Sequence, residues 1–287
     1  MNILLEWQDI SRQAVHQGLY LDSQRSMHEL QTLDLAEQVR RDHPSMGCRD
    51  IYHAVASKMP RGRDWTEQLL LDCGYRAKRS TRSFTEAGKD ICPNLIEGMQ
   101  ITESSQLWQT DITYVWTKNR WYYVSFIFDV YTRQILSRHC SRDLNGKSQI
   151  QCLNKALKKV KKTDRVGLIV HTDRGTQYTS LAYRKYLTNC GISHSMAHYA
   201  WENAFCERVH RTIKHNYLKH YQIECFDSLK AGVAKAVRMY NGTKPHRGLP
   251  GRVSPDQFVK ERRQDKHTDY EVKIWSKLTS TKTLHVN

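Results

Sequence analysis

No stretch of this 287-residue sequence approaches the roughly 18 consecutive apolar residues that a membrane-spanning helix requires, and its mean hydropathy is -0.70. The opening residues, MNILLEWQDI, carry Glu6 and Asp9 inside their apolar stretch and lack the basic segment that begins a secretory signal. We therefore expect a cytoplasmic protein that has no membrane partner.

Paired cysteines are also missing. Eight cysteines are scattered along the chain, but none forms a C-x-x-C pair, and their spacing matches neither a zinc knuckle nor a secreted disulfide framework. The 14 histidines contain no H-E-x-x-H pattern. We expect reduced thiols and no zinc site.

Positive charge, in contrast, is in excess and unevenly distributed. The formal net charge is +16; residues 1–100 carry 13 Lys and Arg against 14 Asp and Glu, whereas residues 101–287 carry 32 against 15. A strongly basic segment beside a nearly neutral one indicates that the second part binds a polyanion. Composition alone leaves open a basic protein whose charges are merely solvated.

The first part of the chain has a helical pattern. Apolar residues recur at helical spacing through residues 1–75, and Pro44 and Pro60 interrupt the pattern. This predicts short helices that form either a small helix-turn-helix DNA-binding unit or an ordinary helical bundle. Residues 76–105 are polar and irregular, which predicts a linker.

From residue 106 the pattern changes to strands. WQTDITYVWT, WYYVSFIFDV and RQILSRHC predict three strands, the first two joined by a hairpin turn at residues 118–120. After them, helical and strand patterns alternate: helices at 145–161, 178–189, 202–220 and 226–241, and strands in VGLIVHT and ISHSM. The order predicts an α/β core over 106–262, with a mixed sheet flanked by helices, and a basic tail over 263–287.

Two aspartates occupy positions suited to chemistry on phosphates. Transfer of a DNA phosphoryl group requires charge neutralisation, which two divalent cations about 4 Å apart can supply if carboxylates converge on them. Asp111 lies inside a predicted strand, and Asp173 directly follows the apolar strand VGLIVHT. Sites in α/β proteins lie at the carboxyl ends of such strands. Each aspartate alone also fits a solvated edge charge or a cap.

A glutamate on a predicted helix is a third candidate. Glu207 is followed by His210, Arg211 and Lys214 at i+3, i+4 and i+7, so these residues share its helix face. Such a face could hold a metal ion and the neighbouring DNA backbone together. The alternative is a solvated face with ion pairs.

Other residues of this region have structural interpretations. Asp129, in FIFDV, is expected to bond Thr132 or Arg133 in the turn after its strand. The aromatic run Trp121–Tyr123 is expected to pack in the hairpin and core, with nucleic-acid stacking as the less favoured alternative.

Six segments together resemble one family. WQTDITYV, FIFDVYTRQIL, HTDRGTQYTS, GISHSM, ENAFCERVHRTIKHNYL and YNGTKPHRGLPGRVSPDQF follow one another in the order seen in bacterial insertion-sequence transposases. The chain resembles the second-reading-frame product, which carries the integrase catalytic core. DISRQAVHQ and HPSMGCRDIYHAV are similar to that product's helix-turn-helix segment, so the resemblance covers nearly the whole chain.

The resemblance implies a ribonuclease-H-like core with a D-D-E triad. Asp111, Asp173 and Glu207 match its three acids, which hold two Mg²⁺ or Mn²⁺ ions. The implied DNA contacts come from four basic residues: His171, Arg174, Arg211 and Lys214.

One departure from the family pattern concerns the third acid. Asp173 and Glu207 are separated by 33 residues, two fewer than is usual in the family. The shortening falls in AHYAWENA, before the helix, where loops tolerate changes in length. Glu202 is a competitor, but the helix register that follows Glu207 is kept, so Glu207 is preferred.

The resemblance also implies a function: metal-dependent DNA strand cleavage and strand transfer during transposition of an insertion sequence. The implied partners are double-stranded DNA (transposon ends and target), further copies of the chain, and the upstream-frame product. A nucleoid-associated protein is expected. Two alternatives remain open: a DNA-binding regulator with a decayed core, and a nuclease on the same fold.

Overall fold

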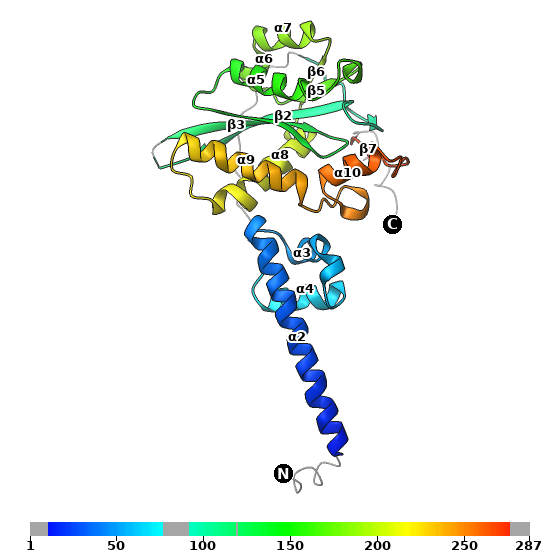
Figure 1. Cartoon of the computed structure of the whole chain (residues 1–287). Coiled ribbons are helices and arrows are strands. Elements are labelled where there is room, and N and C mark those ends of the chain that lie inside the picture. The colour runs from blue at the N-terminus through cyan, green and yellow to red at the C-terminus, as the bar shows by residue number, and fades with distance from the viewer. Residues whose placement is uncertain (1–10, 77–91, 119, 276–287) are drawn as a thin grey trace, which may run out of the picture. The chain divides into compact units, whose positions relative to one another are not determined.

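The computed structural model describes residues 11–76, 92–118 and 120–275. The chain forms two compact units, residues 1–79 and 80–287 (Figure 1). Among the described residues, no helix is both long and apolar enough to cross a membrane.

The first unit is helical, as predicted. It contains α2 (Arg12–Asp42), α3 (Cys48–Ala54), the short η1 (Ala56–Lys58) and α4 (Arg63–Asp72). α2 is longer than the short helices that the pattern predicted, and it ends directly before His43 and Pro44. Its C-terminal half packs on α3 and α4 through a small core in which Ala36, Ile51 and Leu70 are fully buried. The helix-turn-helix function of this unit remains a prediction.

The second unit is built on a mixed five-stranded sheet. Its order is β4-β3-β2-β5-β6, in which β2, β3 and β4 are antiparallel and β5 and β6 run parallel to β2. This confirms the predicted α/β class and the ribonuclease-H-like core. The strand bounds are β2 Leu107–Trp116, β3 Trp121–Asp129, β4 Ile135–Ser141, β5 Ile169–Thr172 and β6 Ser193–Met196.

Helices cover both faces of this sheet (Figure 1). α5 (Gly146–Leu157) and α7 (Leu181–Asn189) lie on one face, and α8 (Ala204–Thr212) and α9 (Phe226–Gly242) lie on the other. Alternation along β2 supplies both cores, because Leu107 faces the α8–α9 side and Trp108 faces the α5–α7 side. The short α6 (Thr176–Thr179) precedes α7.

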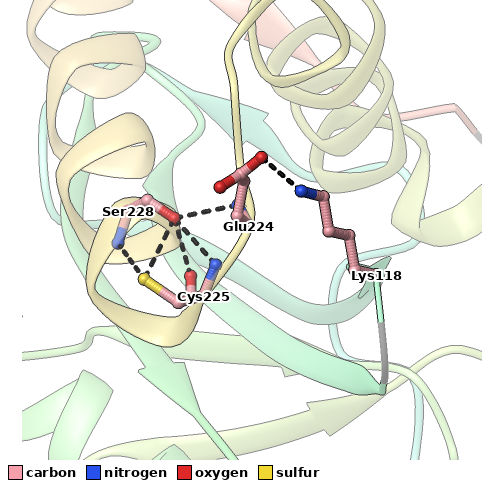
Figure 2. A network of polar contacts seen from close by, with 4 residues as sticks. All are labelled: Lys118, Glu224, Cys225 and Ser228. Carbon is pink, nitrogen blue, oxygen red and sulfur yellow. Dashed lines mark hydrogen bonds and ion pairs between the residues drawn. The ribbon is translucent and has the colours of Figure 1, made fainter.

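A polar network fixes the start of α9 beside the β2–β3 turn (Figure 2). Lys118 Nζ lies 2.5 Å from Glu224 Oε1, and both side chains are exposed, so this ion pair adds little stability. Cys225 caps the helix: its Sγ accepts from Ser228 N at 3.4 Å, while Ser228 Oγ accepts from Cys225 N at 3.0 Å. The network satisfies backbone groups that the first turn of the helix leaves unpaired.

The ordered unit extends beyond the segment predicted as the core. β1 (Gln100–Ile101) pairs antiparallel with β7 (Val272–Lys273), so residues from the expected linker and the expected tail meet. Ile96, Ile101 and Val272 are buried in the core on the α8–α9 side. α10 (Pro255–Arg262) precedes β7 and begins at the Ser254 cap. A strand of two residues is too short to show an alternating pattern, so β1 and β7 could not be predicted from the sequence.

Asp129 has the structural role expected of it. Its Oδ1 accepts from Thr132 N at 2.8 Å and from Thr132 Oγ1 at 3.0 Å. Its Oδ2 accepts from Ser105 N at 2.8 Å and from Trp108 Nε1 at 3.1 Å. One buried carboxylate therefore closes the β3–β4 turn and anchors the entry into β2.

Candidate active site

The sheet register places two of the predicted acids side by side. β2 and β5 pair in parallel, with Trp108 opposite Val170 and Gln109 opposite His171. Continuing this register by two residues sets Asp173, the first residue after β5, opposite Asp111. Adjacent strands are about 4.8 Å apart, and residues at equal positions of a parallel ladder share a face. The two aspartates thus converge by strand geometry.

Two polar side chains fasten the start of α8 to β2. Gln109 Nε2 donates to the Glu202 carbonyl at 3.2 Å, and Gln109 Oε1 accepts from Cys206 N at 3.2 Å. Asn203 Nδ2 donates to the Thr110 carbonyl at 3.3 Å. Gln109 and Asn203 are therefore positioning residues that the sequence analysis missed, because a buried amide carries no signal until its partners are known.

Glu207 lies in the first turn of α8, directly after the fastened residue Cys206. Its electrostatic neighbours place it at the same site: burial raises the pKa of Glu207, Arg211 opposes this, and Asp173 adds to it. The start of α8 thereby places Glu207 within electrostatic range of Asp111 and Asp173.

The carboxylates interact electrostatically. Burial raises the pKa of Asp111 well above its usual range, and the charges of Asp173 and Glu207 raise it further. Burial also raises the pKa of Asp173, which the Gly175 N–H partly offsets. Acids whose pKa values are raised by desolvation and by one another are characteristic of functional sites.

The donor set suits a hard divalent cation. One oxygen of Asp111 accepts from Ile112 N at 2.7 Å, and one oxygen of Asp173 accepts from Gly175 N at 3.0 Å. The second oxygen of each carboxylate can still bind a metal ion. In the described ranges, no three His, Cys, Asp or Glu side chains gather around one ion position. Mg²⁺ is commonly held by one or two carboxylates plus water and substrate phosphates, so three acids shared between two ions fit this arrangement.

Gly175 allows the Asp173 side chain to take its position. A Cβ on Gly175 would lie 3.0 Å from Asp173 Oδ1 and 3.0 Å from Gln177 Oε1. The backbone therefore has to come close to the carboxylate at this point, and a larger residue would displace it.

Glu202, the competitor for the third acid, is used locally. Its Oε2 accepts from His198 N at 2.5 Å and from Tyr199 N at 3.2 Å, at the start of the short helix η3 (Ala200–Asn203). Arg174 holds the same loop, because its Nε donates to the Ala197 carbonyl at 2.9 Å. The shortened loop is thus held by Glu202 and by Arg174, so the Glu202 carboxylate is occupied by local hydrogen bonds.

His171 is a correction to the expected DNA contacts. Its side chain is fully buried, and its Nδ1 lies 2.9 Å from Ser195 Oγ. Burial lowers its pKa to about 3, with His194 and His198 adding to the effect, so it is neutral at physiological pH. This buried ring supports the sheet between β2 and β6, and in this structure its side chain is not exposed for a DNA contact.

The basic face after Glu207 is also altered. α8 ends at Thr212 and continues as a π turn, η4 (Ile213–Tyr217), so Lys214 lies at the start of this wider turn. Arg211 is exposed and lowers the pKa of Glu207. Lys214 is partly buried, which lowers its own pKa.

The raised pKa of Asp111 predicts a stability cost in the metal-free protein. A carboxyl whose folded pKa exceeds its unfolded value destabilises the fold as pH rises above the unfolded value. Asp111→Asn should therefore raise the melting temperature in chelator at pH 7.5, by about 2–4 °C. The gain should vanish below the unfolded pKa of about 3.9. A gain of equal size at acid and neutral pH would contradict the electrostatic cause; thermal denaturation across pH measures both.

Comparison with known proteins finds integrase core domains and insertion-element proteins. An integrase core domain family matches residues 102–199, and a second integrase core domain family matches residues 188–255. An uncharacterized 31 kDa protein of insertion element IS600 from Shigella sonnei is 30% identical over 202 residues, 67% of this chain and 71% of the relative. The transposase for insertion sequence element IS904 from Lactococcus lactis is 32% identical over 190 residues, 65% of this chain and 73% of the relative.

Solved structures overlap more distantly. The HTLV-2 integrase catalytic core domain, determined in complex with magnesium, is 21% identical, with a TM-score of 0.44, and the match covers 57% of this chain and 98% of that one.

Proposed function

This chain belongs to the integrase-core family of bacterial insertion-sequence transposases, and we propose that Asp111, Asp173 and Glu207 form its catalytic D-D-E triad. The chain is a polynucleotidyl transferase that cleaves DNA and transfers strands during transposition. The observation that best supports the residue assignment is the β2–β5 register together with the attachment of α8 to β2, because Asp111 then interacts electrostatically with both Asp173 and Glu207.

Each acid has a distinct role in the proposed mechanism. Two Mg²⁺ or Mn²⁺ ions would supply the positive charge that activates water or a 3'-hydroxyl and neutralises the pentavalent phosphate. Asp111 on β2, Asp173 after β5 and Glu207 on α8 would together hold these ions. Because strand and helix backbones fix these carboxylates, the attacking and leaving oxygens can be held in line. No side-chain nucleophile is required.

The remaining partners follow from the same proposal. Arg211 lies beside Glu207 on the exposed side of α8, where it would contact the phosphate backbone near the reacting strand. Lys214 would contribute to the same interface from the π turn. The helical first unit would read the transposon ends in the major groove. Further copies of the chain and the upstream-frame product would complete the assembly.

Cleavage and joining of an element-end duplex test the function directly. With Mg²⁺ or Mn²⁺, the chain and its upstream-frame product should nick the end and transfer it into a second duplex, and EDTA should abolish both reactions. Products can be resolved on denaturing gels. Cleavage without joining would identify a nuclease, and tight binding without either reaction would identify a regulator.

A further inference from the structure

A concave basic surface lies along the outer edge of the sheet, apart from the candidate active site. A cavity of about 620 Å³ opens beside the edge strand β4. Five of its lining residues are Lys or Arg, none is Asp or Glu, and we call this set the basic edge: Arg138, Lys155, Lys158, Lys159 and Lys230.

The basic edge draws its charges from both faces of the sheet. Lys155, Lys158 and Lys159 come from the C-terminal end of α5 and the turn after it, and Lys230 comes from α9. Arg138 lies opposite Phe126, which lies opposite Asp111, so Arg138 is two strands away from the candidate site. Two strand spacings amount to about 10 Å within the sheet.

Few of these charges are neutralised locally. Lys155 Nζ lies 3.2 Å from His139 Nδ1, and Lys159 Nζ donates to the Leu136 carbonyl at 2.6 Å; neither partner carries negative charge. Lys230 pairs with Asp227 at 2.8 Å, and both side chains are exposed. Among the described residues, the Lys230–Asp227 pair is the only ion pair between a residue of the basic edge and a carboxylate. The concavity therefore carries a net positive field that attracts an anion.

The chemistry of the lining identifies the partner. A second copy of the chain docked symmetrically here would place like charges face to face, which opposes association. Four of the five charges of the basic edge are lysines, whose ammonium groups act as point charges on backbone phosphates, and phosphate contacts carry no sequence information. Such a surface binds nucleic acid without regard to sequence, which suits target DNA and not the transposon end.

We propose that the basic edge binds the phosphate backbone of the target DNA duplex. The inference rests on the proposed transposase function, because only strand transfer uses a target. The bound duplex contacts Arg138 and the α5 lysines while the transposon end occupies the carboxylate site, so the two DNA partners are held by separate surfaces.

The test compares two double variants in the full chain. Lys155→Gln with Lys158→Gln removes two charges from the basic edge; Lys185→Gln with Lys260→Gln removes two exposed charges from α7 and α10, outside the cavity. End cleavage is measured without target, strand transfer is measured against target concentration, and binding of a plain duplex lacking element ends is measured by anisotropy across salt concentrations.

The basic-edge variant should cleave ends at the wild-type rate, yet transfer strands about 10-fold more slowly at limiting target, with recovery at saturating target. The salt dependence of plain-duplex binding should become shallower by about two in the log–log slope, since each phosphate contact contributes about 0.9. An equal loss in the control variant, or a parallel loss of end cleavage, would overturn the assignment to target DNA. The salt dependence of plain-duplex binding tests whether the basic edge contacts DNA phosphates even if no strand transfer occurs. Failure of this inference is therefore separable from failure of the proposed function.

Discussion

Replacing Glu207 by Gln should reduce both end cleavage and strand transfer by at least about 10³-fold, whereas Glu202→Gln should leave both within a few-fold of wild type. The loss follows from removing one anionic ligand, since metal stabilisation of the transition state is worth several kcal/mol. Glu202 acts through its two bonds to His198 N and Tyr199 N, and an amide oxygen can accept both. Single-turnover rates with Mg²⁺ measure the difference.

The matched controls separate chemistry from folding. Asp173→Asn should show a loss as large as that of Glu207→Gln, while each variant keeps its affinity for end duplex in the absence of metal. If Glu202→Gln were inactive and Glu207→Gln active, the shortened loop would have moved the third ligand, and the proposed triad would be wrong. Equal, modest losses in both would indicate that the helix start, and not a metal ligand, had been disturbed.

Most of the sheet could be predicted from the sequence because its strands are long and aromatic or β-branched. Period-two patterning placed β2 and β3 to within one residue, and the apolar run before Asp173 located β5. The convergence of Asp111 with Asp173 could not follow from pattern alone, because it depends on a parallel register between segments some 60 residues apart. The resemblance to a family supplied that link.

The DNA contacts that the resemblance implied stay predictions, and the structure shows that two of their four residues lie in less exposed surroundings than expected. His171 sits in a strand with neighbours on both sides, so a residue next to the site is nonetheless fully buried. Lys214 was placed by counting along an α-helix, but it lies at the start of a π turn. The apolar run VGLIVHT indicated a buried strand, but a π turn has no local sequence signature.

The segment YNGTKPHRGLP illustrates how a motif can be recognised without its role being understood. Asn241 contacts the backbone of the edge strand twice: its Oδ1 accepts from Ile135 N and its Nδ2 donates to the Ile135 carbonyl, both at 3.0 Å. Tyr240 OH lies 3.1 Å from His246 Nε2 within the same segment. This motif fixes α9 to β4, and it therefore supports the basic edge as well as the core.

Asp129→Ala should lower the free energy of unfolding by about 3–5 kcal/mol, which is a large share of the stability of a typical domain. The substitution orphans four donors at once: the Ser105 and Thr132 N–H groups, the Trp108 indole and the Thr132 hydroxyl. Each buried unsatisfied group costs about 1–3 kcal/mol before relaxation and water entry reduce the sum. Urea denaturation measures the change.

Two further variants distinguish lost hydrogen bonds from lost charge. Asp129→Asn keeps the side-chain volume but turns an amide NH₂ group toward two of the four donors. Its free energy of unfolding should therefore lie between those of the wild type and Asp129→Ala. Asp143→Ala removes an exposed aspartate from the turn after β4 and should change stability by less than about 0.5 kcal/mol. If Asp129→Asn were as stable as the wild type, the four hydrogen bonds of the Asp129 carboxylate would not be what fixes the start of β2. The position of Asp111, six residues farther along the chain from Ser105, would then need another explanation.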